Sequence, residues 1–219
     1  MFGCQRQGTG CFSLENHVSY NNLMEREIVM ALGKQAKTLT DKQMKFVLSY
    51  IADTRDPLRN KVMFLLSVDA ALRACEIASV EWSMVCDAAG ELTDEIRLQD
   101  KSSKGRSGGV VYMSARLKDA LAELKQQSDA SGTIIKAKSG KPFSAASMTN
   151  WFWVMYRDLD LEGCSSHSGR RTAITRWSRN ITAAGGSLRD VQALARHQSL
   201  QMTQKYIAIS EDAMKRVVG

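Results

Sequence analysis

The sequence predicts a mostly helical fold with a small antiparallel β-sheet, an α+β domain. Only two prolines, Pro57 and Pro142, occur in 219 residues, so long uninterrupted helices are possible along most of the chain. Between Glu95 and Met113 the pattern changes to an alternation of apolar and polar residues around a glycine-rich turn, which is typical of a hairpin. The hydrophobic content of 44% is sufficient for one packed core.

Two helices are predicted at the start of the domain. Thr40 and Gln43 have the spacing of a capping box, which marks a helix N-terminus. The residues expected to face the core from this helix are Phe46, Val47, Tyr50 and Ile51. Pro57 suits the first position of a second helix, and the stretch 62–72 is apolar on nearly every side. This second helix is therefore expected at the centre of the domain.

A hairpin and two further helices are predicted next. Ile96 and Leu98 alternate with polar residues, and the apolar run 110–112 follows a turn rich in lysine, serine and glycine. Ser114 and Ser147 are the expected N-caps of the helices. Their expected core residues are Leu117, Ala120, Leu121 and Leu124 in the first, and Trp151, Phe152, Met155 and Leu159 in the second. Core packing is preferred over base stacking for Trp151 and its neighbour Trp153, because they have the spacing of an amphipathic helix.

The last predicted feature is a pair of helices separated by a break. A capping pattern at Ser187 begins a helix that is expected to run through Arg196, and Ser199 begins another that carries Tyr206. His197 then lies in the joint. Nine residues of unbroken helix, at about 100° each, would place His197 and Tyr206 on opposite faces, so the break allows them to converge.

Charge and cysteine usage limit the classes of function. Thirty basic against 23 acidic residues give a net charge of +7, which favours an anionic partner without separating DNA from RNA or lipid. The five cysteines form neither a CxxC pair nor a zinc-ligand pattern, so we expect reduced thiols, no disulfide and no structural metal. No stretch approaches the roughly 20 apolar residues that span a bilayer, and the N-terminus lacks a signal-peptide core. A cytoplasmic protein without a membrane partner is expected.

Two segments of unequal length are predicted. Residues 1–37 contain several glycines, mixed polarity and only a short helical pattern, so we expect a short, partly ordered N-terminal arm. Residues 38–219 show no internal repeat and no low-complexity block, and we expect them to form one compact domain.

Two pairs of polar residues have the spacing of one helix face. His167 and Arg170 lie three residues apart, as do Arg73 and Glu76, so within a helix each pair can meet one ligand. Either pair alone is weak evidence. A pair of this kind is more often a solvated helix face, and Arg73 beside Glu76 can be an ordinary surface ion pair. The order and spacing of the pairs along the chain therefore decide between a functional site and a solvated helix face.

Three sequence boxes occur in a fixed order. The chain reads ALRACEIASVEW at 71–82, HSGRRT at 167–172, and LARH at 194–197 followed by TQKY at 203–206. With this order and separation the chain resembles the tyrosine recombinase, or phage integrase, family over roughly residues 37–212. The resemblance implies the fold of that family's catalytic domain. It also implies a site-specific recombinase that breaks and rejoins DNA strands.

The resemblance assigns catalytic roles to residues of this chain. The implied catalytic residues are Arg73, Lys101, His167, Arg170, His197 and Tyr206. The two arginines would clamp the scissile phosphate, because a guanidinium is always charged and binds phosphate oxygens in pairs. The histidines would donate further hydrogen bonds. The phenol of Tyr206 would attack the phosphate to give a 3′-phosphotyrosyl link and a free 5′-hydroxyl, with no metal, ATP or other cofactor.

Supporting roles follow from the same resemblance. Lys101 would protonate the leaving 5′-oxygen as a general acid, with Lys104 as the alternative. Glu76 is expected to orient His167 from behind, with a simple ion pair to Arg73 as the alternative. The residues expected to bind DNA phosphates are Lys104, Arg106 and Arg171.

The implied partner is double-stranded DNA, bound by a protein that is monomeric when free and tetrameric on paired sites. Its expected place in the cell is the cytoplasm, in association with the nucleoid. Two departures from the family pattern stand out: Gly169 occupies a position where many relatives carry leucine, and the arm 1–37 is too short for the usual core-binding domain. The chain is then a short complete recombinase, a fragment, or a protein helped by an accessory DNA-bending or core-binding partner. The alternatives are a type IB topoisomerase and a catalytically idle DNA-binding remnant.

Overall fold

The computed structural model describes residues 35–99, 108–207, 215 and 218. The chain divides into two compact units, residues 1–35 and 36–219, and the described helices and strands lie in the second unit. The predicted boundary between an arm and a domain at residue 37 stays a prediction.

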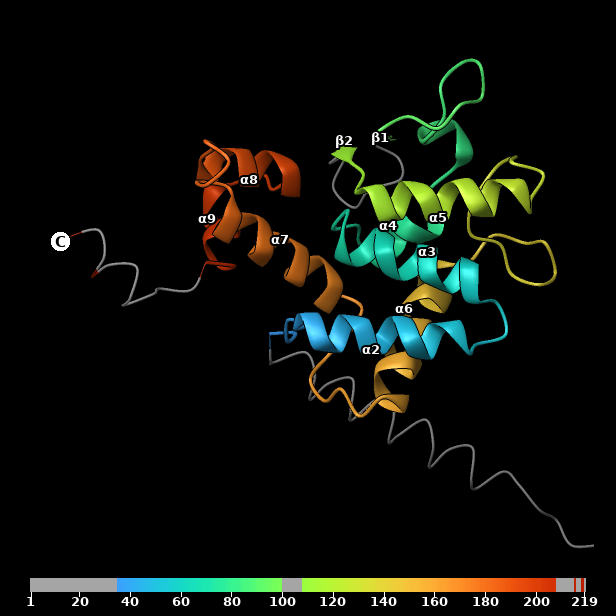
Figure 1. Cartoon of the computed structure of the whole chain (residues 1–219), viewed down its shortest axis with the longest axis horizontal. Helices are drawn as coiled ribbons and strands as arrows, with labels where there is room; N and C mark the ends of the chain where they lie inside the picture. Colours follow the sequence, from blue (N-terminus) through green and yellow to red (C-terminus); the bar gives the residue numbers. More distant parts are fainter. Residues whose placement is uncertain (1–34, 100–107, 208–214, 216–217, 219) are drawn as a thin grey trace, which may run out of the picture. The chain divides into compact units, whose positions relative to one another are not determined.

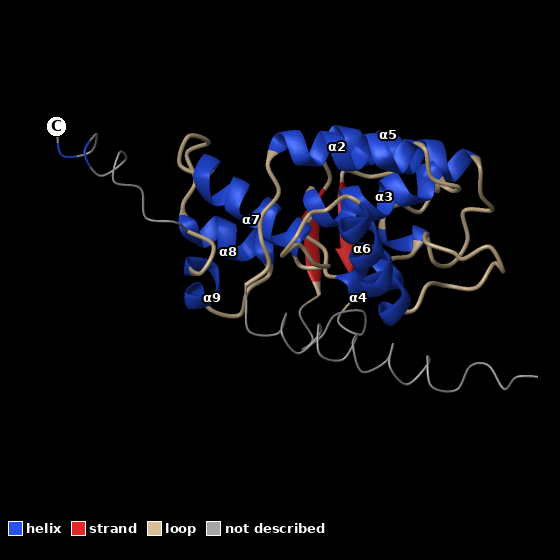
Figure 2. Cartoon of the chain, turned by 90° about the horizontal axis from the view of Figure 1, so that it is seen from below, coloured by secondary structure: helices blue, strands red, loops and turns tan. Residues whose placement is uncertain are grey.

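The described residues form helices and one two-stranded sheet, which confirms the predicted α+β class (Figure 1). In chain order the elements are α2 (Asp41–Ala52), α3 (Pro57–Val68), α4 (Ala74–Ser79), the 3₁₀ helix η1 (Trp82–Met84), β1 (Glu95–Leu98), β2 (Gly109–Tyr112), α5 (Ala115–Gln126), α6 (Ala145–Asp158), α7 (Ser168–Asn180), α8 (Leu188–Ala195) and α9 (Leu200–Gln204). Figure 2 shows how strongly helix predominates over strand.

Helix α2 begins at the predicted capping box. The backbone N–H of Gln43 donates to Thr40 Oγ1 at 3.2 Å, and the N–H of Thr40 donates to Gln43 Oε1 at 2.9 Å. The buried residues of the helix are Met44, Val47 and Ile51. Phe46 is 53% exposed, so its predicted place in the core is wrong. It lies next to Val47 in sequence, about 100° around the helix from the buried stripe.

Helix α3 is the centre of the domain, as predicted. Pro57 occupies its first turn, and every residue from 62 to 68 is buried. The helix packs against α2, α4, α5 and α7, and in Figure 1 it runs between α2 and α5. A helix that is apolar on all sides is stable only when other elements surround it, and this arrangement supplies them.

The predicted hairpin is confirmed. Strands β1 and β2 are antiparallel, with Ile96 opposite Val111 and Leu98 opposite Gly109. Ile96, Leu98 and Val111 are buried, whereas Tyr112 is exposed, which is the alternation of a sheet with one covered face. The connection carrying residues 100–107 lies outside the described residues.

Helix α6 begins three residues before the predicted position. Ser144, not Ser147, is the N-cap, and its Oγ accepts the backbone N–H of Ser147 at 3.0 Å. Both serines precede the apolar residues at a suitable distance, so the sequence pattern alone does not separate them. Phe152 is buried as predicted, and Trp151 packs against the same core while remaining partly exposed. Trp153 is also only partly buried.

The close approach of α7 to α3 depends on Gly169. A Cβ at this position would lie 2.1 Å from the Oγ of Ser67 and 2.8 Å from its Cβ. Ser67 is fully buried in α3, so it has no space into which to move. The glycine therefore permits α7 to pack tightly at its first turn, which carries His167 and Arg170.

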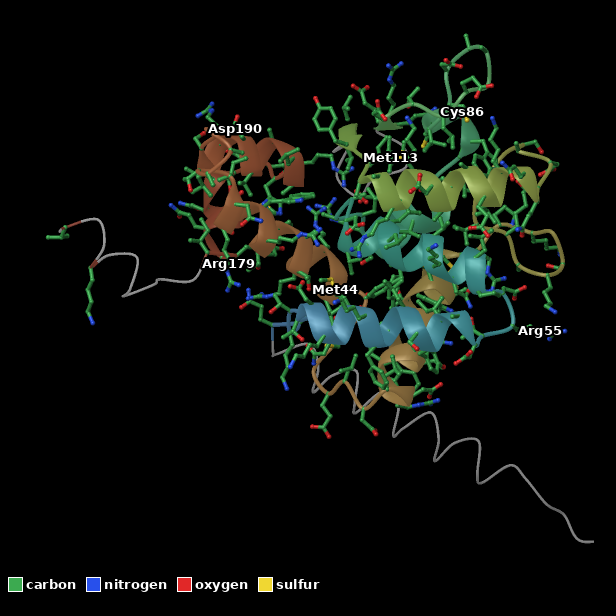
Figure 3. The ribbon with its side chains drawn as sticks, viewed as in Figure 1. Met44, Arg55, Cys86, Met113, Arg179 and Asp190 are labelled. Carbon is green, nitrogen blue, oxygen red and sulfur yellow. The ribbon has the colours of Figure 1, made fainter. Side chains whose placement is uncertain are left out.

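A second small core joins α7 and α8, and Tyr206, which follows α9, packs against it. Its buried residues are Ala71, Ala173, Ile174, Val191 and Ala195. Helix α8 begins with the predicted capping box, in which Asp190 accepts the backbone N–H of Ser187 at 2.7 Å (Asp190 is labelled in Figure 3). In the parts of the chain that the structure describes, every helix is too short or too polar to span a bilayer.

We expect Gly169→Ala to lower the free energy of unfolding by about 1–3 kcal/mol, because the added methyl group overlaps Ser67. Alanine favours helix over glycine, so a loss would come from the overlap and not from helix propensity. Chemical denaturation measures the difference. The matched test is the double variant Gly169→Ala with Ser67→Gly, which should be more stable than Gly169→Ala alone. A single variant as stable as the wild type would contradict the close packing.

Candidate active site

The first part of the site is the start of α4. Ala71 has a left-handed backbone, with φ of 52°, which turns the chain two residues before Arg73. Arg73 is the N-cap, and the carboxylate of Glu76 accepts both its backbone N–H and its Nη1, each at 2.8 Å. Arg73 and Glu76 therefore form an ion pair. One fifth of the Arg73 side chain (21%) stays exposed, which leaves it accessible to a ligand.

Glu76 has a second arginine partner that the sequence does not indicate. Arg196 donates its Nη2 to Glu76 Oε2 at 2.8 Å, and the Glu76 side chain is completely buried. The two carboxylate oxygens of Glu76 accept from Arg73 and Arg196, and the expected role of Glu76 in orienting His167 stays a prediction. Burial by itself would raise the pKa of the Glu76 carboxyl, but Arg196 and Arg73 outweigh it and the pKa is lowered.

Arg170 joins three segments that are distant in sequence. It lies one turn into α7 and is 4% exposed. Its Nη1 donates to the carbonyl of Ala71 at 2.5 Å and its Nη2 to the carbonyl of Ala195, the last residue of α8, at 2.6 Å. Burial, followed by the charge of Arg73, lowers the pKa of Arg170 to about 10, so the guanidinium is still charged at neutral pH.

His167 is the N-cap of α7 and is exposed. Partial withdrawal of its ring from water lowers the pKa of the imidazole, and the charges of Arg170 and Arg73 lower it further. His167 lies three residues before Arg170, at the start of the same helix. A neutral imidazole at this position can accept a proton at neutral pH.

His197 lies in the predicted break between α8 and α9. It is 6% exposed, and its Nδ1 is 3.0 Å from the hydroxyl of Thr203. Burial lowers the pKa of His197 to about 4, with additional contributions from Arg170, Arg73 and Arg196. The ring is therefore neutral at pH 7. When the Thr203 hydroxyl donates to Nδ1, the Nε2 carries the proton and can donate it to a ligand.

Tyr206 packs beside His197. The two rings are stacked with centroids 5.3 Å apart and an interplanar angle of 25°. The guanidinium of Arg171 lies 5.6 Å from the centroid of the Tyr206 ring. The sequence predicts Tyr206 on the last helix, but α9 ends at Gln204 and the tyrosine lies in the turn that follows. The convergence of His197 and Tyr206 across the helix break is confirmed.

The hairpin also contributes to the surroundings of the site, where strand β2 begins next to Arg196. A Cβ at Gly109, the first residue of β2, would lie 3.5 Å from Cδ of Arg196. The hairpin therefore begins its second strand beside the arginine. The three predicted residues of the connection, Lys101, Lys104 and Arg106, lie outside the described residues.

The described site has an excess of positive charge. The guanidinium groups of Arg73 and Arg196 bind the carboxylate of Glu76, and Arg170, whose pKa is affected by all three groups, adds a third positive charge. Such a centre is suited to an anion with several oxygens, because preorganised donors and charge act together in a region of low dielectric. Among the described residues, no group of three or more histidine, cysteine or acidic side chains is arranged to hold a metal ion.

Arg196 is a residue of the site that sequence reasoning misses. In the sequence it marks only the end of a helix, because its partner Glu76 lies 120 residues earlier in the chain. The available signal is its place inside the box LARH, directly before His197.

The described domain of helices with one small hairpin therefore carries a centre of arginine, histidine and tyrosine side chains. The sequence model of the Phage integrase family matches residues 37–212, and the chain belongs to this family. This confirms the resemblance found in the sequence. No curated protein sequence matches the chain.

Solved structures of similar fold include one integrase and two recombinases. The Tn1549 transposon integrase in complex with a circular intermediate DNA has a TM-score of 0.65 at 15% identity, over 84% of this chain and 66% of that chain. The XerH site-specific recombinase bound to difH has a TM-score of 0.64 at 16% identity, over 84% and 54%. XerA recombinase has a TM-score of 0.62 at 17% identity, over 83% and 62%. At these identities the similarity shows the fold, and the chain spans no more than about two thirds of their lengths.

The depressed pKa of His197 predicts a loss of stability in mild acid. Above its ordinary pKa of 6.5 the ring is neutral in both the folded and the unfolded chain, whereas below it only the unfolded chain binds the proton readily. The free energy of unfolding should fall by about 2 kcal/mol from this residue between pH 7 and pH 5. Chemical denaturation at the two pH values, compared with His197→Gln, isolates the effect. An equally steep loss in the variant would contradict the assignment.

Proposed function

We propose that this protein is a site-specific DNA recombinase that cleaves and rejoins strands through a 3′-phosphotyrosyl intermediate. The observation that carries the proposal is the convergence of Arg73, Arg170, His197 and Tyr206 from three separate segments, around a centre with excess positive charge. Membership of the Phage integrase family supports the same chemistry.

The arginines would bind the scissile phosphate. In Arg73, Nη1 is bonded to Glu76, so Nε and Nη2 remain to donate to a non-bridging oxygen. Arg170 is held by two backbone carbonyls, and each of its Nη atoms carries a second N–H for the phosphate. Because both groups are fixed before the substrate arrives, they stabilise charge in the transition state without reorganisation.

The strand would be cut by Tyr206. Its phenol oxygen forms a bond to phosphorus while the bond from phosphorus to the 5′-oxygen breaks. The phenolic proton would pass to His167, whose lowered pKa keeps it neutral and able to accept. The leaving 5′-oxygen would take a proton from Lys101. Attack by a 5′-hydroxyl of another strand on the phosphotyrosyl bond then reverses the sequence and rejoins the DNA without ATP.

The proposed partner is double-stranded DNA. A net charge of +7 favours it, and the similar Tn1549 integrase and XerH structures are themselves complexes with DNA. Arg171 lies against the Tyr206 ring, where it would contact a phosphate near the cleaved bond. Assembly as a tetramer on paired sites, an accessory or core-binding partner and a place at the nucleoid remain part of the proposal.

Replacement of the nucleophile tests the proposal. Tyr206→Phe should abolish the covalent protein–DNA adduct and leave DNA affinity nearly unchanged, because only the attacking oxygen is removed. The adduct is measured on denaturing gels with nicked suicide substrates that carry inverted repeats from the DNA flanking the coding sequence.

Tyr156→Phe is the matched control. Tyr156 is 1% exposed, and its hydroxyl has no hydrogen-bond partner within the described part of the structure, so its loss should leave the adduct intact. An adduct that persists in Tyr206→Phe would place the nucleophile elsewhere. A wild-type protein that binds these substrates without forming any adduct would contradict the proposed activity.

A further inference from the structure

Arg196 has an unfavourable backbone for its residue type. It ends α8 with φ of 53° and ψ of 45°, in the left-handed region. Glycine adopts this conformation without cost, whereas a side chain of the L configuration meets the adjacent carbonyl oxygen. An arginine retained in a left-handed turn directly before His197 therefore requires a reason that the helix end alone does not provide.

The side chain of Arg196 is also in an unusual environment. It is 5% exposed, and its Nη2 donates to Glu76 Oε2 at 2.8 Å. Its Nε and Nη1 are buried, and no hydrogen-bond partner for them is present in the described structure. Burial of a charged group with unpaired donors is costly, and such groups are concentrated at functional sites.

The ion pair with Glu76 connects two halves of the site. Glu76 belongs to α4 and already binds both the backbone N–H and Nη1 of Arg73. Arg196 precedes His197, which stacks on Tyr206. The contact from Arg196 to Glu76 therefore fixes the segment that carries His197 and Tyr206 against the segment that carries Arg73.

The same contact affects the charge on Arg73. If Glu76 had Arg73 as its sole partner, the carboxylate would neutralise that guanidinium one to one. With Arg196 present, a single negative charge is divided between two guanidinium groups. Arg73 then retains more of its positive charge for an anion, because the attraction that holds it to Glu76 is shared.

We propose that Arg196 is a positioning residue of this site, which shares Glu76 with Arg73 so that Arg73 keeps its charge and its place relative to Tyr206. This inference rests on the proposed recombinase function. Arg196 acts through Glu76 and the helix joint, and its buried guanidinium does not itself need to touch the DNA.

The first measurement separates the rate of cleavage from DNA binding. Arg196→Gln, which shortens the side chain slightly and removes its charge, should slow single-turnover cleavage at saturating protein by about tenfold or more. DNA affinity should stay within about threefold, because Arg73 and Arg170 remain. Arg196→Lys, which restores the charge but not the guanidinium geometry, should recover part of the rate. Arg189→Gln, at an exposed arginine of the same helix, is the control and should match the wild type.

The second measurement does not require activity. The groups whose charges act on His197 are Arg170 from α7, Arg73 from the start of α4, and Arg196. In the protein without DNA, Arg196→Gln should raise the NMR titration midpoint of His197 above its wild-type value of about 4. The charges that act on His167 are those of Arg170 and Arg73, so its midpoint reports whether Arg73 keeps its place in the variant. Assignment of the two histidine signals uses His167→Gln and His197→Gln.

Two outcomes would overturn the inference. One is a wild-type cleavage rate in Arg196→Gln, or a loss of rate matched by an equal loss of DNA affinity, which indicates general disruption. The other is an unchanged His197 midpoint. If the wild-type protein fails to cleave DNA, the proposed function fails, whereas the His197 titration still decides the place of Arg196. Glycine suits the left-handed backbone, so Arg196→Gly provides the same tests should the glutamine variant not fold.

Discussion

The arrangement of the site depends on one buried carboxylate. Glu76 is fully enclosed, and a charge in that position is stable only when opposite charges and hydrogen bonds surround it. Arg73 and Arg196 supply both the opposite charges and the hydrogen bonds. Arg196 lies 120 residues after Glu76 in the chain. The carboxylate thereby joins the start of α4 to the end of α8. Its effect is not a simple gain in stability, since a buried ion pair is costly to desolvate, but a fixed geometry for two cationic groups.

Arg170 provides the second fixed point. The carbonyls of Ala71 and Ala195 orient its guanidinium, and Gly169 beside it allows α7 to approach α3 closely enough for those bonds to form. The helix break after α8 then brings His197 and Tyr206 to the same centre. A site assembled in this manner has its donors in position before a phosphate enters, which is the condition under which electrostatic stabilisation is most effective.

Local features of the fold are predictable from the sequence, and distant pairings are not. The capping box at Thr40 and the alternation of Ile96 and Leu98 act over a few residues, so their patterns are visible in the chain itself. Two serines, Ser144 and Ser147, precede the same apolar run, and only the packed helix decides which of them is the N-cap. The partners of Glu76 do not follow from spacing. They depend on how the segment carrying Arg196 docks on α4, and on a left-handed backbone that an arginine gives no reason to expect.

The most direct test of the role of Glu76 is the free energy of unfolding of Glu76→Gln at pH 7. Glutamine preserves the shape of the side chain and removes its charge, leaving two guanidinium groups without their counterion. We expect chemical denaturation to show a loss of about 3–5 kcal/mol. Glu123→Gln, at an exposed position on α5, should stay within about 0.5 kcal/mol of the wild type. A Glu76→Gln variant as stable as this control would contradict the claim that the buried carboxylate holds the site together.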